Sequence, residues 1–588
     1  MDENLIDRED PNFQLHCIRH SAAHIMAHAV QRLMPEAKFA IGPVIKDGFY
    51  YDMDLPRTLT TEDLEAIEAE MKQIVKENNG FQHEDWDKDK ARQFFGEHHQ
   101  DYKLELIDGI GDEMVSIYKE GDFTDLCAGP HVRYTKQCKH FKLLKVSGAY
   151  WRADENNAML QRVYGTAWAS KEDLDKYLYQ IEEAAKRDHR KLGKELGLVM
   201  FHEYAPGAPF WLPKGQTIFR ILSDKMRNYN LRNGYVEVGT PQMFRKDLWE
   251  TSGHWDHYRE NMFIFDDEET QIGLKAMNCP SHMLIFKNER RSYRELPLRI
   301  HDQGVLHRNE KSGALSGLTR VRKFCQDDAH LFVTPDQVDA ELSKLLKMAR
   351  NTYDAFGMKF SKVYLSTRPE DAMGDPELWE KAEASLARAI EEAGLSFELN
   401  AGDGAFYGPK IDFIIEDALG REWQTATLQL DFQLPLRFDL KYVDANNEFK
   451  TPIVIHRAFY GSLERFIGVL IEHYAGAFPT WLAPVQVHVL NLGEGQLEYA
   501  EQVHKQLLAA GIRSHLDHRN ESVNYKIRDG ELQKIPYMLV LGDREVENNT
   551  VTVRRLHQAK GRPEAVSLQD FIANIQAEAD VDFVDPDV

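Results

Sequence analysis

Histidine and cysteine side chains recur near the start of the chain in a pattern that can do chemistry. His20 and His24 are four residues apart in RHSAAHIMAHAVQRLM, and Cys127 and His131 repeat that spacing later. Side chains four apart share one face of a helix, so the first pair can converge on one point. Such residues bind metals or carry protons near neutral pH. From the residues alone, a reactive site and ordinary hydrogen-bonded helix histidines both remain open, and the lack of an H-E-x-x-H motif disfavours a metalloprotease.

A basic stretch over residues 299–323 has the composition of an anion-binding segment. It holds six Lys and Arg residues against two acidic ones, and Arg308 and Arg320 flank a turn rich in Ser and Gly. The planar guanidinium of arginine donates bidentately to phosphate, and the neighbouring Phe324 offers a ring on which a purine can stack. A nucleotide site and a solvated surface loop both fit this composition.

The elements that must position these side chains indicate several domains. At roughly 150 residues per domain, a chain of 588 residues predicts three to four domains. Apolar periodicity predicts a helix over residues 19–34, and Thr60 and Asp63 have capping-box spacing before another. Residues 100–168 alternate short apolar stretches with Gly and Pro. We therefore predict a mixed α/β domain over residues 1–169.

The remainder of the chain changes character twice more. Residues 170–197 have dense mixed charge and predict a connecting helix. Residues 198–480 hold many strand-like segments of antiparallel type with helices between them, which predicts an α+β domain; within it a helix beginning near Ser462 carries Arg465, by itself typical of a surface residue. Residues 481–588 predict a compact α/β domain with an acidic tail, whose aspartates are Asp580, Asp582, Asp585 and Asp587.

Composition excludes several classes of protein. The mean hydropathy of −0.52 and the lack of a long apolar run argue against a membrane span, and the acidic N-terminal segment argues against a secretory signal. The five cysteines form no C-x-x-C pair, which fits a reducing cytoplasm. The formal charge of −23 by itself argues against a nucleic-acid partner. Because net charge averages over local patches, the basic stretch leaves that last exclusion provisional.

Several motifs occur together in a telling order. MNCPSH, HRNE…RVRKFCQDDAH and VIHRAFYGSLERF resemble the signature motifs of class II aminoacyl-tRNA synthetases. The chain is closely similar to the threonyl-tRNA synthetase family over residues 16–557, including HSAAH and CAGPH of that family's editing domain. The resemblance implies an α+β multidomain protein with an antiparallel-sheet catalytic domain, an α/β editing domain and an α/β anticodon-binding domain. The small domain that usually precedes the editing domain in bacterial members is not expected here.

The same resemblance implies an activity and its residues. The chain would ligate L-threonine to tRNA(Thr) through threonyl-adenylate, using ATP with Mg²⁺. One Zn²⁺ per subunit would be held by Cys279, His330 and His456. Threonine would contact Gln326, Asp328, Tyr407 and Gln429. ATP would contact Arg308, Arg320, Phe324 and Arg465, of which Arg308 and Arg465 would also be catalytic, and His254 would assist transfer to tRNA.

Editing is implied because serine keeps the hydroxyl group of threonine. A missing methyl group discriminates by only ~1–3 kcal/mol, so a second site must remove serine from mischarged tRNA. By resemblance this site consists of His20, His24, Lys103, Asp125, Cys127 and His131, and we expect hydrolysis by water without a metal. Anticodon bases would be read by Asn520, Glu545 and Arg554. The family also implies a cytoplasmic homodimer with no membrane partner.

Two other functions compete with this one. A stand-alone editing hydrolase or a non-catalytic tRNA-binding regulator would share the fold, and so would a synthetase for proline or serine. Paralogues of the first kind typically lose catalytic arginines or zinc ligands, whereas every one of those residues is present here. The complete set therefore favours a synthetase that both charges and edits.

Overall fold

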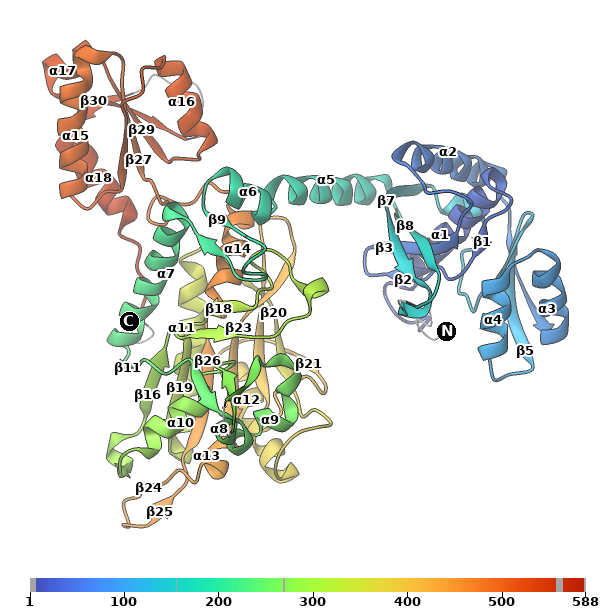
Figure 1. Ribbon diagram of the computed structural model, residues 1–588, viewed down its shortest axis with the longest axis horizontal. Helices are drawn as coiled ribbons and strands as arrows, with labels where there is room; N and C mark the ends of the chain where they lie inside the picture. Colours follow the sequence, from blue (N-terminus) through green and yellow to red (C-terminus); the bar gives the residue numbers. More distant parts are fainter. Residues whose placement is uncertain (1–6, 155, 268–269, 557–563, 586–588) are drawn as a thin grey trace. The chain divides into compact units, whose positions relative to one another are not determined.

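The structure is a computed structural model that describes residues 7–154, 156–267, 270–556 and 564–585. Its chain divides into two compact units, Met1–Glu182 and Glu183–Val588, which are described in turn (Figure 1). None of the helices within the described ranges is both long and apolar enough to cross a membrane.

The first unit is built around one deeply buried helix. Helix α1 (Phe13–Leu33) begins six residues before the predicted start, and every side chain from Cys17 to Val30 is buried. It packs against α2 (Thr61–Glu77) and against the sheet ordered β1-β3-β8-β7, with β2 paired to β3. The predicted capping box is confirmed: Thr60 caps α2 and Asp63 returns the contact. The strands of this sheet are β1 (Lys38–Phe39), β2 (Val44–Ile45), β3 (Gly48–Asp54), β7 (His140–Tyr150) and β8 (Met159–Trp168).

A second, smaller sheet completes this unit. Strands β4, β5 and β6 form an antiparallel meander with a small apolar core against α3 and α4. Since β6 also contacts α1, the meander brings residues of the 125–131 segment to the buried helix. These elements are β4 (Phe81–Asp87), β5 (Met114–Glu120), β6 (Phe123–Leu126), α3 (Lys88–Glu97) and α4 (Asp101–Gly109).

The predicted connecting helix over residues 170–197 is not continuous. It consists of α5 (Lys171–Arg187) and α6 (His189–Glu195), separated at Asp188. The Asp188 side chain accepts a hydrogen bond from the backbone N–H of Arg190 at 2.7 Å, so it caps a new helix instead of extending the first. The dense charge that predicted a helix gave no sign of this interruption.

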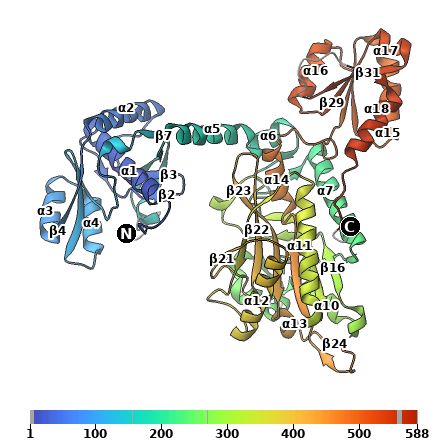
Figure 2. The ribbon, with the colours of Figure 1, turned by 180° about the vertical axis from the view of Figure 1, so that it is seen from behind.

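An eight-stranded sheet forms the centre of the second unit. Its order is β11-β16-β19-β26-β23-β22-β20-β21; the two edge pairs are parallel and the rest antiparallel. Helices α11 and α12 belong to the core on one face, and Figure 2 shows α11 in front of the strands. The elements are β11 (Tyr235–Glu237), β16 (Leu298–Asp302), β19 (Asp328–Val333), β20 (Phe360–Ser366), β21 (Glu398–Asn400), β22 (Lys410–Glu416), β23 (Glu422–Asp431), β26 (Ile453–Ala458), α7 (Pro213–Arg232), α11 (Val338–Asp354), α12 (Pro376–Glu392) and α14 (Leu463–His473).

Alternation along β19 separates the two faces of this sheet. Ala329, Leu331 and Val333 join the core beneath the helices. Successive side chains point to opposite faces of a strand, so Asp328 and His330 lie on the other face. The smaller elements of this unit are α8 (Lys246–Ser252), α9 (His254–His257), α10 (Cys279–Lys287), α13 (Leu434–Arg437), β9 (Val199–Met200), β10 (Phe210–Trp211), β12 (Met243–Arg245), β13 (Ile264–Asp267), β14 (Thr270–Leu274), β15 (Arg291–Ser292), β17 (Val305–His307), β18 (Lys323–Cys325), β24 (Tyr442–Val443) and β25 (Phe449–Lys450).

The C-terminal part folds around a sheet of its own. Strands β28, β27 and β29 run parallel, and β30 and β31 continue the sheet antiparallel. The segment between β29 and β30 contains α17. The elements are β27 (Val487–Asn491), β28 (Ser514–Asp517), β29 (Tyr537–Leu541), β30 (Thr550–Arg555), β31 (Glu564–Ser567), α15 (Leu497–Ala509), α16 (Val523–Leu532), α17 (Asp543–Asn548) and α18 (Leu568–Ala579).

The acidic tail makes specific contacts with α7. Arg232 forms ion pairs with Asp582 and Asp585, and the hydroxyl of Tyr229 donates to the carbonyl of Val584. Phe583 is buried in the core that surrounds the eight-stranded sheet. The tail therefore packs as part of the fold, as far as Asp585; Asp587 lies outside the described residues.

Candidate functional site

Strand register aligns three predicted site residues across the open face of the large sheet. His330 on β19 is directly opposite His456 on β26, and His456 is opposite Gln429 on β23. The two imidazole ring centroids are 4.5 Å apart. A row of opposed residues on neighbouring strands needs no loop to hold it, so its geometry is set by the sheet itself.

Cys279 joins the two histidines from the first residue of α10. One donor atom from each of Cys279, His330 and His456 lies within 4.8 Å of the others, and all three residues are buried. Burial lowers the pKa of His330 well below its ordinary value, which keeps the ring neutral and able to act as a ligand. Sulfur and two imidazoles are a typical zinc donor set that leaves one coordination position open.

Two side chains orient these imidazoles from behind. His282 Nδ1 lies 2.8 Å from His330 Nδ1, and Asp431 Oδ2 lies 2.9 Å from His456 Nε2. Each contact occupies one ring nitrogen and leaves the other for a ligand, as outer hydrogen bonds do in metal sites. The residues present therefore fit a zinc ion in both donor type and orientation.

The cavity beside this cluster is lined by every predicted threonine contact. Its volume is about 290 Å³, and its walls include Gln326, Asp328, Tyr407 and Gln429 together with the three cluster residues. The Tyr407 hydroxyl donates to Gln429 Oε1 at 2.7 Å, and Asn278 Nδ2 donates to Asp328 Oδ2 at 3.1 Å. Burial raises the pKa of Asp328 to about 6, although the Asn278 contact opposes the shift. A small polar cavity with fixed hydrogen-bonding groups is suited to a polar amino acid.

A larger cavity adjoins it and holds the predicted nucleotide residues. Its volume is about 430 Å³, and Arg308, Arg320, Phe324 and Arg465 line it. Arg308 lines both cavities, and its guanidinium lies 5.0 Å from the centroid of the Phe324 ring. Within the described ranges, the buried Nε atoms of Arg308 and Arg465 have no hydrogen-bond partner. Unpaired guanidinium groups aimed at one cavity favour an anionic ligand such as a polyphosphate.

His254 is not part of either cavity wall. It is fully buried; its Nδ1 lies 2.8 Å from the hydroxyl of Ser252 and its Nε2 lies 3.8 Å from Cys279 Sγ. Burial lowers its pKa to about 3. The structure thus buries this residue beside Cys279 Sγ.

The editing residues predicted from the first unit do converge. Cys127 Sγ lies 3.3 Å from His20 Nε2 and 3.2 Å from His131 Nε2, and donor atoms of these three residues and His24 lie within 4.8 Å of one another. Burial raises the pKa of the Cys127 thiol to about 12 and lowers the pKa of His20 to about 3. The cluster is therefore neutral near pH 7. A cavity of about 310 Å³ opens on His20, His24, Lys103, Asp125 and Cys127, with His131 behind the thiol.

A buried ion pair supports this cluster. Lys103 Nζ lies 2.5 Å from Asp125 Oδ1, and His24 Nε2 lies 3.5 Å from Asp125 Oδ2. Tyr51 donates its hydroxyl to the same carboxylate and accepts from Lys103 at 3.0 Å. Burial alone would raise the pKa of Asp125, but the charge of Lys103, the nearby His24 and the hydrogen bonds from Lys103 and Tyr51 together outweigh burial, and the pKa is lowered. A charged aspartate is thereby fixed beside neutral histidines.

The three predicted anticodon residues lie on separate elements of the C-terminal sheet domain. Asn520 is exposed in the loop after β28, and Arg554 on β30 lies 3.6 Å from Glu531. Glu545 belongs to α17, where its carboxylate accepts from the N–H of Gly542 at 2.8 Å and from the hydroxyl of Thr552 at 2.7 Å. Both oxygens of Glu545 thus already have partners within the domain.

Sequence reasoning missed the residues that orient the sites. Tyr51, His282 and Asp431 contact the predicted site residues, and Lys410 lines both catalytic cavities. His282 stands in the quoted MNCPSH motif, so the motif itself was a signal. The others carry no pattern of their own, because only the tertiary fold brings them near their partners.

Family comparisons agree with this architecture. Residues 261–474 match the tRNA synthetase class II core domain (G, H, P, S and T), residues 486–578 match an anticodon binding domain, and residues 115–164 match the threonyl and alanyl tRNA synthetase second additional domain. The large antiparallel sheet with its paired cavities is thus the core of a class II aminoacyl-tRNA synthetase.

Similar proteins indicate which family within this class the chain belongs to. A threonine–tRNA ligase of Clostridium novyi is 53% identical over 562 residues, covering 95% of this chain and 88% of the relative. Threonine–tRNA ligase 2 of Bacillus subtilis is also 53% identical, covering 95% of this chain and 87% of the relative. The solved RNA binding domain of threonyl-tRNA synthetase from Cryptosporidium parvum, 45% identical, has a TM-score of 0.65 and covers 68% of this chain and 99% of that one. The chain belongs to the threonyl-tRNA synthetase family.

Membership confirms the predicted fold class and the predicted enzyme class, a tRNA ligase with an editing domain. It also shows that the provisional exclusion of a nucleic-acid partner was wrong.

Proposed function

We propose that the two adjoining cavities activate L-threonine with ATP and pass it to tRNA(Thr), while the first unit hydrolyses mischarged seryl-tRNA(Thr). The observation that carries the proposal is the place of Arg308. It lines both the small polar cavity and the larger arginine-lined cavity. An amino-acid carboxylate and the α-phosphate of a nucleotide must meet at such a boundary before they can react.

The first step needs positioning and charge stabilisation more than proton transfer. The threonine carboxylate attacks the α-phosphorus, its oxygen bonds to phosphorus, and pyrophosphate leaves with its Mg²⁺. Arg308 holds the α-phosphate, and Arg465 and Arg320 hold the distal phosphates and the adenine. Fixed groups of this kind act without reorganising during the reaction. Phe324 supplies the ring face, and the tRNA ribose hydroxyl then attacks the carbonyl carbon and releases AMP.

Threonine selection rests on the three buried ligands and the groups beside them. Cys279, His330 and His456 would hold a zinc ion, which supplies a Lewis-acid position for the amino and hydroxyl groups of threonine. Asp328, Gln326, Tyr407 and Gln429 hydrogen-bond and orient the substrate. Valine lacks the hydroxyl, and a site built to satisfy it rejects such an analogue by roughly 10⁴ or more.

Editing follows from the neutral cluster in the first unit. His20 Nδ1 lies 3.1 Å from the carbonyl oxygen of Pro130, so this nitrogen carries the proton, and Nε2, which lies 3.3 Å from Cys127 Sγ, keeps its lone pair. A neutral imidazole can take a proton from water as the water attacks the seryl ester. Asp125 and Lys103 fix His24 beside it. We propose that no metal is needed for this hydrolysis.

The remaining features of the proposal concern organisation. Residues 1–169 edit, residues 170–197 connect, residues 198–480 catalyse and residues 481–588 bind the anticodon. Asn520 and Arg554 contact anticodon bases, and Glu545 contributes by holding α17 near them. His254 supports the transfer step from behind Cys279. The enzyme functions as a cytoplasmic homodimer.

Pyrophosphate exchange tests the proposal directly. Purified zinc-replete protein should exchange pyrophosphate into ATP when threonine is present and not when valine or proline replaces it. Serine should support slower exchange. Absence of threonine-dependent exchange would leave an editing hydrolase or a regulator as the function, and exchange driven best by proline or serine would identify a different synthetase.

A further inference from the structure

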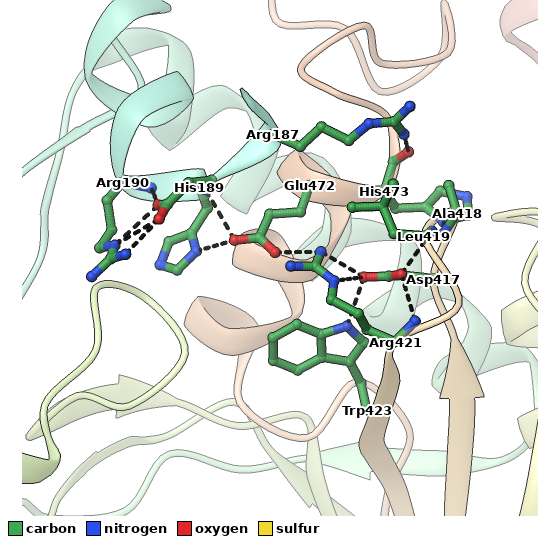
Figure 3. Close-up of polar contacts among 11 residues, drawn as sticks. Arg187, His189, Arg190, Asp417, Ala418, Leu419, Arg421, Trp423, Glu472 and His473 are labelled. Atoms are coloured by element: carbon green, nitrogen blue, oxygen red, sulfur yellow. Dashed lines mark hydrogen bonds and ion pairs between the residues drawn. The ribbon is translucent and has the colours of Figure 1, made fainter. Parts of the chain in front are cut away.

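A buried polar network at the start of α6 lies outside both sites described above. Figure 3 shows His189, the first residue of α6, facing Glu472 on α14, and Glu472 in turn facing Arg421. The two side chains His189 and Glu472 are 5% and 6% exposed. Burying ionisable groups is costly unless each is fully paired, so the network is expected to hold something in place.

The hydrogen bonds fix one tautomer of His189. Its Nδ1 lies 2.6 Å from Glu472 Oε1, which can only accept, so Nδ1 carries the proton. Its Nε2 therefore has a lone pair, and it accepts the backbone N–H of Leu318 at 3.0 Å. One imidazole thus links α14 to the loop between β17 and β18.

That loop carries residues of the nucleotide cavity. Thr319 and Arg320 directly follow Leu318, and both line the 430 Å³ cavity. Leu318 itself is fully buried in the core of the catalytic domain. The other ends of the network also reach the cavity walls, because α14 carries Arg465 and the Arg421 turn leads into Gln424.

Gly317 shows that the loop is shaped to the imidazole. Its φ is +49°, a conformation that favours glycine, and a Cβ there would lie 2.2 Å from His189 Nε2. Gly313, in the same loop, has open space where its Cβ would be. The positive φ and the close approach to His189 together explain the glycine at residue 317.

We infer that His189 is a positioning residue for ATP: through the Leu318 N–H it holds the loop that places Thr319 and Arg320 over the nucleotide cavity. The inference rests on the proposed function, because it requires that cavity to bind ATP. Among the described residues, His189 lines neither the 290 Å³ nor the 430 Å³ cavity, so its effect is exerted through the loop. Threonine contacts lie in the smaller cavity and should not depend on it.

Two conservative variants separate the two hydrogen bonds of His189. In His189→Asn the amide nitrogen takes the place of Nδ1 and keeps the Glu472 bond, but no acceptor remains for Leu318. In His189→Gln the amide oxygen takes the place of Nε2 and keeps the Leu318 bond. Since one hydrogen bond is at stake, His189→Asn should raise KM for ATP about three- to tenfold with KM for threonine unchanged. His189→Gln should stay within about twofold of the parent enzyme.

The same pyrophosphate exchange assay, on the full zinc-replete chain, distinguishes the outcomes. An unchanged KM for ATP in His189→Asn, or an equal rise in both KM values, overturns the positioning role while leaving the proposed function intact. No exchange by the parent chain overturns the proposed function and this inference with it.

A glycine pair provides a readout should the histidine variants be poorly folded. Gly317→Ala should raise KM for ATP in the parent enzyme, and much less in a His189→Ala background, where the imidazole is gone. Gly313→Ala, the matched control, should change KM for ATP little in either background. If the effects of Gly317→Ala and His189→Ala on KM for ATP were additive, contact between the loop and the imidazole would be refuted as the cause of the loop's position.

Discussion

Replacing Lys103 by methionine removes the cation from the buried pair of the editing domain while keeping most of the side-chain volume. Both members of the Lys103–Asp125 pair are 3% exposed, and the two charged atoms lie 2.5 Å apart. The variant leaves the Asp125 carboxylate buried with only the Tyr51 hydroxyl and the edge of His24 nearby. Loss of one partner from such a pair typically costs about 3–5 kcal/mol of stability.

The chain offers a matched control for this change. Lys38 and Asp101 form an ion pair of nearly the same length, 2.6 Å, but their side chains are 36% and 62% exposed. Solvent screens such a pair, so Lys38→Met should cost at most about 1 kcal/mol. The difference between the two lysine variants isolates the contribution of burial.

Hydrogen exchange of the peptides that cover β5 and β6 measures the difference in stability loss between the two lysine variants. The comparison is made under conditions in which exchange requires unfolding. At about 1.4 kcal/mol per tenfold change, Lys103→Met should accelerate exchange by roughly two to four orders of magnitude. Seryl-tRNA deacylation should fall as well, because Asp125 no longer fixes His24. Equal stability loss in the two lysine variants would show that burial does not set the strength of this pair.

The sign of the pH dependence gives a second check on the same variant. Without the lysine charge, burial raises the pKa of Asp125 above its value in the unfolded chain. The folded state then binds a proton more readily than the unfolded state, so the variant gains stability as pH falls from 8 toward 5. If the loss of stability in Lys103→Met stayed constant between pH 8 and pH 5, Asp125 would not be charged and buried in the variant.

Three further outcomes follow from the sites. Cys279→Ala should lower the metal content of the purified protein below one per chain and abolish threonine-dependent exchange; full metal content, measured by mass spectrometry, would contradict the ligand assignment. Cys127→Ala should let seryl-tRNA accumulate during charging with serine while threonylation persists, whereas unchanged deacylation would remove the thiol from the editing site. Because burial lowers the pKa of His20 to about 3 and that of His24 to about 4, deacylation should show no decline through pH 6.5; a midpoint there would indicate an exposed histidine instead.

Local signals in the sequence predicted local structure well. Capping-box spacing at Thr60 and Asp63 depends only on neighbours in the chain, and the capping box is present. The editing histidines were placed on one helix face by their spacing, and the structure brings them together. The break between α5 and α6 within residues 170–197 could not be predicted in the same way, because Asp188 acts as a cap only in the context of the folded turn.

Contacts between residues far apart in the sequence could not be predicted from the residues alone. Cys279, His330 and His456 have no informative spacing, and only the resemblance to a family pointed to them. Their convergence comes from the register of β19 with β26 and from the start of α10 beside that pair. Antiparallel register across three strands is a property of the whole sheet, so no window of the sequence contains it.

The net charge of this protein is an average over the whole chain, and it misleads about the partner. A net charge of −23 argued against a nucleic-acid partner, yet the family to which the chain belongs acts on tRNA. Net charge does not say where the charges lie: Asp582 and Asp585 pair with Arg232, and Asp125 pairs with Lys103, none of which lines the nucleotide cavity. By contrast, Arg308 and Arg465 at the nucleotide cavity keep buried Nε atoms that have no partner in the part of the chain that the structure describes. What a ligand meets is the local excess left after internal pairing, and at this cavity the excess is positive.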